Sequence, residues 1–159
     1  MYATHGTDLK RSIKAHPSQK FTVVINPHSG PGSSQSPGTE YTTQIQNLTR
    51  YPNVQTLGYV RTGNATRAIN DVLSDISVYS RWDTVEKDGV NATALAMHGI
   101  FFDEAPHEYS PENVEYMSRI NQAAKDATGV LLPKTVRFEA FVNACSSGGL
   151  CGCVPCASS

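Results

Sequence analysis

Short apolar runs alternate with segments of helical periodicity along most of this chain, and this alternation limits the possible fold more than any other feature. Strands are predicted at residues 21–26 and 54–60, and a third within residues 95–102, because these runs are rich in β-branched and aromatic side chains. A last strand is predicted at residues 135–142. Nearly continuous apolar character is typical of strands that are buried on both faces of a parallel sheet.

Before and between these runs, apolar residues recur three or four positions apart, as on one face of an amphipathic helix. The last such segment has the clearest start, because Ser110 suits an N-cap and Pro111 suits the first helical position. The expected buried residues are Leu9 and Ile13 in the first helix, Tyr41, Ile45 and Leu48 in the second, Ile69, Val72, Leu73 and Ile76 in the third, and Val114, Met117, Ile120, Ala124 and Ala127 in the fourth. Alternating helices and strands predict an α/β fold with a parallel sheet of right-handed βαβ units.

The composition excludes several classes of protein. The 159 residues suit one domain with a sizeable hydrophobic core. Thirteen Lys and Arg against 14 Asp and Glu give a formal charge of −1, which argues against a nucleic-acid partner. No apolar run approaches the roughly 20 residues that span a bilayer, so we expect no membrane insertion. No signal peptide is visible at the start of the chain. These limits do not decide between an enzyme and a binding domain.

All four cysteines lie in the last fifteen residues, at Cys145, Cys151, Cys153 and Cys156. A zinc site usually needs two well-separated Cys-x₂₋₄-Cys pairs, whereas only Cys153 and Cys156 have such a spacing. We therefore expect no metal and no cofactor, and a disulfide-linked or disordered tail instead. The predicted organisation is a folded domain at residues 1–142, followed by a tail rich in Cys, Gly and Ser at residues 143–159.

Polar residues follow the predicted strands at the carboxyl edge of the sheet, where functional groups collect in parallel α/β folds. Asn26 follows the first strand, Tyr59 and Arg61 end the second, and Asp103 and Glu104 follow the third. An arginine at the end of an apolar strand needs an anionic or carbonyl partner nearby. Asn26, Tyr59 and Arg61 are therefore our candidate substrate-binding residues.

Asp103 and Glu104 directly follow the apolar residues Gly-Ile-Phe-Phe, so their carboxyl groups lie at the rim of an apolar wall. Two carboxyl groups in different surroundings can divide the general acid and base roles of a catalytic site. The alternative is structural, because an Asp at the end of a strand often caps a loop or the next helix. Neighbouring strand residues point to opposite faces, so both carboxyl groups can face one site only if the strand ends between them.

Three motifs, FTVVINPHSGPGSS (residues 21–34), YPNVQTLGYVRTG (51–63) and HGIFFDEAP (98–106), together resemble the spherulation-specific family 4, or spherulin-4-like, proteins. The resemblance extends over about residues 8–130. It implies a (β/α)₈ barrel and glycoside hydrolase activity on galactosamine-containing polysaccharide, of the α-1,4-N-acetylgalactosaminidase type. It also implies that Asp103 and Glu104 are the catalytic acidic pair, and that the protein is secreted or at the cell surface, as in fungi and slime moulds.

The chain departs from this family pattern in its length. A whole barrel takes about 250 residues and eight βα units, whereas this sequence predicts three or four, so we expect a partial (β/α)₈ barrel. The resemblance implies a further catalytic Glu on a later strand, but Glu139 follows Asp103 too closely to fill that place. A truncated, weakly active or inactive hydrolase that self-associates through its open sheet edges is therefore the leading hypothesis.

Two other hypotheses remain at this point. One is a non-catalytic cell-wall or spore-coat protein that binds polysaccharide through the same strand ends. The other is an independent flavodoxin-like domain, for which the length is suitable but for which no phosphate-binding turn follows any predicted strand.

Overall fold

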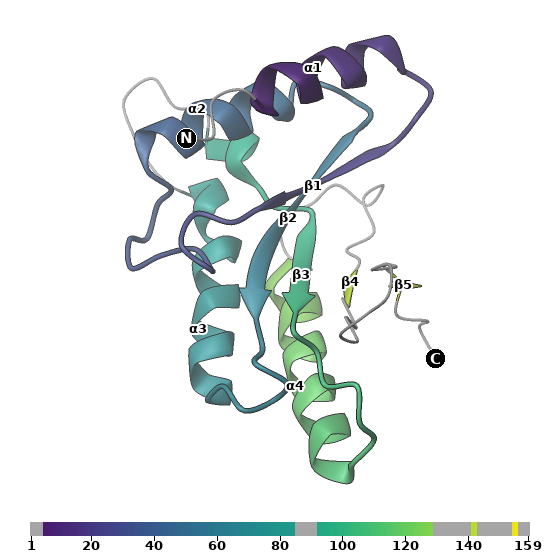
Figure 1. The fold of residues 1–159 in the computed structure, drawn as a ribbon. Helices are drawn as coiled ribbons and strands as arrows, with labels where there is room; N and C mark the ends of the chain where they lie inside the picture. The colour runs from purple at the N-terminus through teal and green to yellow at the C-terminus, as the bar shows by residue number, and fades with distance from the viewer. Residues whose placement is uncertain (1–4, 85–91, 129–140, 143–153, 156–159) are drawn as a thin grey trace.

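The computed structural model describes residues 5–84, 92–128, 141–142 and 154–155, and it confirms the alternation of helices and strands (Figure 1). The helices are α1 (His5–Ala15), α2 (Thr39–Leu48), α3 (Ile69–Ser80) and α4 (Pro111–Thr128). The strands are β1 (Phe21–Ile25), β2 (Val54–Arg61), β3 (Gly99–Asp103), β4 (Phe141–Val142) and β5 (Val154–Pro155), and two 3₁₀ turns are η1 (Trp82–Thr84) and η2 (Ala92–Leu95).

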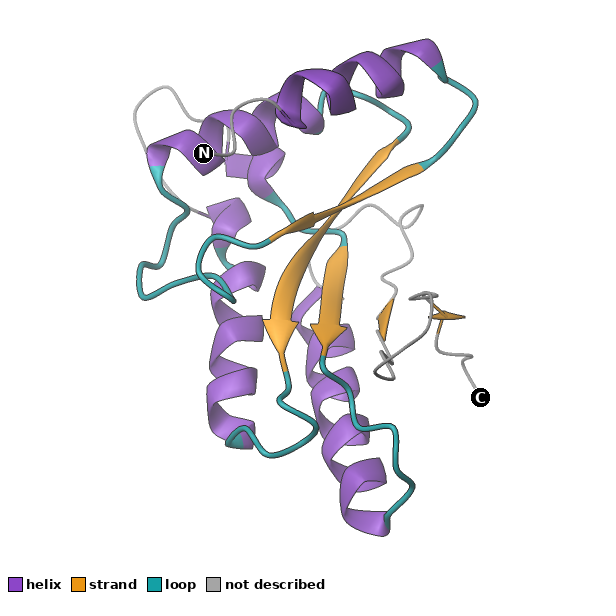
Figure 2. Ribbon diagram, viewed as in Figure 1, coloured by secondary structure: helices purple, strands orange, loops and turns teal. Residues whose placement is uncertain are grey.

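The strands form one sheet in the order β1-β2-β3-β4-β5 (Figure 2). The pairs β1–β2, β2–β3 and β3–β4 are parallel, as the sequence predicts, whereas β5 is antiparallel to β4. One row across the sheet joins Ile25, Gly58 and Ile100, and a later row joins Arg61 to Asp103. This register places the carboxyl ends of β2 and β3 side by side.

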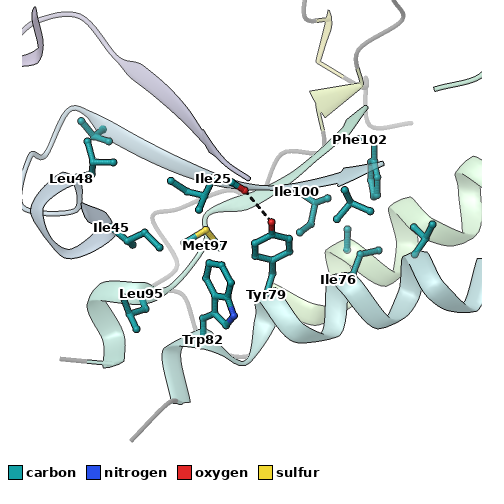
Figure 3. Close-up of a cluster of buried hydrophobic side chains, with 14 of the residues drawn as sticks. Ile25, Ile45, Leu48, Ile76, Tyr79, Trp82, Leu95, Met97, Ile100 and Phe102 are labelled. Carbon is teal, nitrogen blue, oxygen red and sulfur yellow. Dashed lines mark hydrogen bonds between the residues drawn. The ribbon is translucent and has the colours of Figure 1, made fainter. Parts of the chain in front are cut away.

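One face of the sheet packs against the helices. All four helices contribute side chains to the same hydrophobic cluster as the strand residues on that face. Figure 3 shows part of this cluster. Its members include Ile25, Val60, Ile100 and Phe102 from the strands, and Ile13, Ile45, Val72, Ile76, Ile120 and Ala124 from the helices. Because side chains alternate along a strand, the opposite face presents Tyr59, Arg61, Phe101 and Asp103.

The prediction that β1 is buried on both faces is wrong. Phe21, Val23 and Ile25 contact or lie in the core, whereas Thr22 is exposed and Val24 keeps 38% of its surface accessible. Thr22 and Val24 point away from the core, so the apolar run of β1 is covered on one face only. An apolar run by itself does not distinguish these two environments.

The predicted buried face of the last helix is correct except at Val114, which is 51% exposed. Ile120 and Ala124 are buried, and Met117 and Ala127 pack against the core. Figure 1 shows that the first turns of α4, which include Val114, extend beyond the ends of the described strands β1, β2 and β3. The predicted N-cap is confirmed, because the Ser110 hydroxyl accepts a hydrogen bond from the Asn113 amide at 3.1 Å.

Gly58 allows α3 to approach the centre of the sheet closely. The Tyr79 ring lies so near that a Cβ atom at Gly58 would be 2.6 Å from it. The Tyr79 hydroxyl donates a hydrogen bond to the Ile25 carbonyl at 3.0 Å (Figure 3), and burial raises the pKa of this phenol. The same ring meets Trp82 edge to face at 4.7 Å. Tyr79 therefore ties α3 to both β1 and β2.

Several sequence predictions fall outside the described residues. Only Phe141–Val142 of the strand predicted at residues 135–142 is described, and it pairs with β3. The four cysteines and Glu139 also lie outside. Within the described ranges, no helix has the length and apolar character needed to cross a membrane.

We predict that Gly58→Ala lowers the free energy of unfolding by about 1–3 kcal/mol, because the new methyl group overlaps the Tyr79 ring. Gly38→Ala is the control, since a Cβ there meets no atom within 4 Å, and it should cost less than about 1 kcal/mol. Urea unfolding of both variants measures the difference, and equal stability of the two would contradict the close approach.

Candidate functional site

The ends of β2 and β3 bring four of the five predicted site residues together. The Tyr59 hydroxyl donates a hydrogen bond to Asp103 Oδ2 at 2.6 Å. Arg61 Nε donates to Glu104 Oε2 at 2.7 Å, which supplies the anionic partner that the sequence predicts for this arginine. The two donors lie two positions apart on β2 and therefore on the same face. Each carboxyl group of the acidic pair thus meets its own donor on the neighbouring strand.

Glu104 has a left-handed backbone conformation, with φ of +53°. β3 ends at Asp103, so the strand ends between the two acidic residues, which is the condition under which both can face one site. A non-glycine residue in this conformation costs about 1–3 kcal/mol and persists only when its surroundings hold it. The sequence could not show this turn, because Glu is not a residue that favours positive φ.

Several hydrogen bonds hold the strained backbone of Glu104. Its amide donates to Asp103 Oδ1 at 2.9 Å. Its carbonyl accepts from Thr62 Oγ1 at 2.6 Å and from the Asn64 amide at 2.7 Å. Thr62 is fully buried and also binds the Asp103 carbonyl through its amide, at 2.9 Å, and through its hydroxyl, at 3.0 Å. Sequence reasoning missed Thr62, because a threonine after a strand gives no distinctive signal.

Backbone strain gathers at this edge of the sheet. Among the described residues, the non-glycine residues with positive φ are Ser29, Asn64, Ala65 and Glu104. Ser29 follows β1, Asn64 and Ala65 follow β2, and Glu104 follows β3. Such conformations cluster at ligand-binding and catalytic sites in proteins. Their placement independently identifies the carboxyl edge as the candidate site.

The electrostatics favour hydrogen-bond donation by β2 and acceptance by the acidic pair. Burial, and then the hydrogen bond to Asp103, raise the pKa of Tyr59 to about 12, so the phenol keeps its proton at neutral pH. The hydrogen bond and charge of Glu104 raise the pKa of Arg61. The Arg61 and Glu104 side chains are 54% and 40% exposed, so this ion pair adds little stability. Its main effect is on orientation, and both groups remain within reach of a ligand.

Asn26, the remaining predicted site residue, supports the loop after β1. Its side-chain oxygen accepts a hydrogen bond from the Gly30 amide at 3.1 Å, and its carbonyl accepts one from the Tyr41 hydroxyl at 3.3 Å. In the described part of the chain, no hydrogen bond joins Asn26 to Asp103 or Glu104. Its proposed role in substrate binding stays a prediction.

The polar groups of the site can both donate and accept hydrogen bonds. Two carboxyl groups, a phenol and a guanidinium offer both acceptors and donors at one edge. The centres of the Phe101 and Tyr59 rings lie 6.3 Å apart, and the Phe101 ring adds apolar surface. Residues 5–84 and 92–128 contain no group of three or more His, Cys, Asp or Glu side chains placed to hold a metal.

The sequence profile of spherulation-specific family 4 matches residues 3–145, which include the whole candidate site. The chain belongs to this family. Spherulin-4 from Physarum polycephalum is 34% identical over 110 residues, which cover 69% of this chain and 29% of that protein. The family resemblance of the three sequence motifs is therefore confirmed.

A solved structure resembles the fold of this chain. The crystal structure of Aspergillus clavatus Sph3 in complex with GalNAc superposes with a TM-score of 0.68 at 42% sequence identity. The match covers 74% of this chain and 45% of Sph3. The chain thus spans less than half the length of either relative.

We predict that Glu104→Gly leaves the protein more stable than Glu104→Ala, by about 0.5–1 kcal/mol, because glycine adopts positive φ without strain. Both variants lose the ion pair, so the difference between their free energies of unfolding reports the backbone strain at position 104. Urea unfolding measures it.

The matched control is Glu115, which is exposed within α4. There the order should reverse, with Ala more stable than Gly by about 0.5–1 kcal/mol, because a helix interior disfavours glycine. If Ala were also the more stable residue at position 104, the strained turn would be contradicted.

Proposed function

We propose that the edge formed by Tyr59, Arg61, Asp103 and Glu104 belongs to a glycoside hydrolase site for polysaccharide that contains N-acetylgalactosamine. The observation that carries the proposal is the pair of carboxyl groups held by β2, in a chain 42% identical to a protein crystallised with GalNAc. The proposed substrates are α-1,4-linked amino-sugar polymers, which are cut at internal bonds of the polysaccharide. The proposed location is the cell surface or the extracellular space.

The described sheet forms part of a (β/α)₈ barrel in this proposal. Support comes from three successive parallel pairings and from the helices, which all pack on one face of the strands. In such a barrel the helices lie outside, and catalytic groups lie at the carboxyl ends of the strands. The proposed division is a barrel part at residues 1–142 and an appended Cys-rich segment at residues 143–159, although Val154–Pro155 of that segment pair with β4.

Cleavage of a glycosidic bond uses one carboxyl group to protonate the leaving oxygen and another as nucleophile or as base for a water molecule. Asp103 and Glu104 are the proposed members of this pair. Tyr59 and Arg61 orient them, and both donors can also reach sugar oxygens. Asn26 is proposed to contact the sugar from the end of β1.

A second candidate function, polysaccharide binding without cleavage, is favoured by a specific observation. Both carboxyl groups accept hydrogen bonds from β2, Asp103 from the Tyr59 hydroxyl and Glu104 from the Arg61 cation, an arrangement that also suits binding of a ligand's hydroxyl groups. Efficient cleavage also needs walls that position neighbouring sugars. The chain spans 45% of the length of Sph3. A cell-wall or spore-coat protein would use the same residues to hold its ligand.

The deciding experiment measures both GalNAc-polymer binding and reducing-end release by the purified chain. We expect the chain to bind the polymer and to release reducing ends slowly. Asp103→Asn or Glu104→Gln should lower any release by about 10²–10⁴-fold, and should also weaken binding. Asp71→Asn, at an exposed acidic position of α3, is the control and should change neither.

The outcomes separate the two candidates. Release of reducing ends that depends on Asp103 and Glu104 supports the hydrolase. Polymer binding that depends on these residues, without release of reducing ends, supports the non-catalytic protein. Absence of binding, or binding that both substitutions leave unchanged, contradicts the proposed site.

A further inference from the structure

Arg67 links the end of β2 to α3 through its side chain. Its Nη1 donates to Asp75 Oδ2 on α3 at 2.7 Å and to the Arg61 carbonyl at 3.0 Å. The Arg67 and Asp75 side chains are only 28% and 18% exposed, so this ion pair is better shielded from water than that of Arg61 with Glu104. One guanidinium therefore binds a helix carboxylate and the backbone of a site residue.

The backbone of Arg67 is also held. Its amide donates to the Thr62 carbonyl at 3.3 Å, and its carbonyl accepts from the Tyr116 hydroxyl of α4 at 2.9 Å. Together with the side-chain bond to Arg61, these contacts close residues 61–67 into a compact turn. The turn is fastened to β2 at its start and to α3 and α4 at its end.

Among the described residues, every hydrogen bond that Glu104 receives from the β2 side comes from this turn. Arg61 Nε binds its carboxylate, while Thr62 Oγ1 and the Asn64 amide bind its carbonyl. Arg61 itself is about half exposed, so its own side chain is not fixed by packing. Closing the turn adds a constraint on the Arg61 backbone, from which the guanidinium extends.

Asp75 also lies close to the loop after β1. Gly30 is buried at φ of +151°, and a Cβ on it would lie 3.1 Å from Asp75 Oδ2. The loop that Asn26 supports and the turn that Arg67 closes therefore lie near the same carboxylate. Asp75 sits between the loops that follow two neighbouring strands.

We propose that Arg67 and Asp75 form a positioning pair, which fixes the turn at residues 61–67 and thereby sets the Arg61–Glu104 contact. The importance of this pair for sugar binding rests on the proposed function. The positioning itself is a property of the turn and can be measured without a ligand. Neither residue is proposed to touch the sugar.

The test follows exchange of the Arg61 Nε proton with water by NMR, because a proton held on Glu104 exchanges slowly. Arg61→Lys assigns the signal. Arg67→Gln and Asp75→Asn should each speed the exchange about tenfold. This is the effect expected if the equilibrium constant for forming the Arg61–Glu104 hydrogen bond falls by a factor of ten. The same variants should weaken GalNAc binding by about 3–10-fold.

Controls separate positioning from stability. Asp71→Asn and Arg81→Gln change exposed charges on or next to α3, and Ile76→Val weakens the core. All three should leave the Arg61 exchange rate within about twofold of the unmodified chain, even where the melting temperature falls. Arg67→Lys provides a milder variant if Arg67→Gln fails to fold. A lysine can pair with Asp75 but lacks the planar fork of arginine, so the Arg61 Nε proton should exchange about threefold faster than in the unmodified chain.

Unchanged exchange in the folded Arg67 and Asp75 variants would overturn the positioning pair, whatever the sugar result. Equal acceleration in Ile76→Val would also overturn it, because loss of stability would then explain the effect. If the unmodified chain binds no GalNAc, the proposed function fails, while the exchange rates still decide this inference.

Discussion

The left-handed turn at Glu104 is the constraint on which the site depends. A regular strand would send Asp103 and Glu104 to opposite faces, whereas ending β3 between them lets both meet β2. The turn costs about 1–3 kcal/mol, and contacts from Thr62 and Asn64 to the same carbonyl hold it in place. The protein thus loses some stability at this turn, and both carboxyl groups are placed at the same edge of the sheet.

The fold supports that placement from the opposite face of the sheet. Gly58 lets the Tyr79 ring pack against β2, and the Tyr79 hydroxyl fixes the Ile25 carbonyl of β1. These contacts add to the parallel pairing of β1 with β2. The parallel register of β2 and β3 then brings Arg61 opposite Asp103. The pairing of β2 with β3 therefore determines which polar groups meet on the face opposite the helices.

The sequence predicts the helices, the first three strands and the meeting of Tyr59, Arg61, Asp103 and Glu104, because periodicity and the strand-end rule depend on local pattern. It does not predict contacts that depend on a particular turn. Thr62 and the Arg67–Asp75 pair fall in this class, as does the positive φ of Glu104. The errors at β1 and Val114 have one cause, since an apolar residue does not reveal whether another element lies opposite it.

The most direct test of the account is a crystal structure of this chain with bound GalNAc. We expect the sugar at the carboxyl edge of β2 and β3, within hydrogen-bond distance of the Asp103 and Glu104 carboxyl groups. We also expect that Tyr59 and Arg61 still contact these groups. A sugar bound away from this edge, or a carboxyl pair pointing to opposite faces of the sheet, would contradict the account.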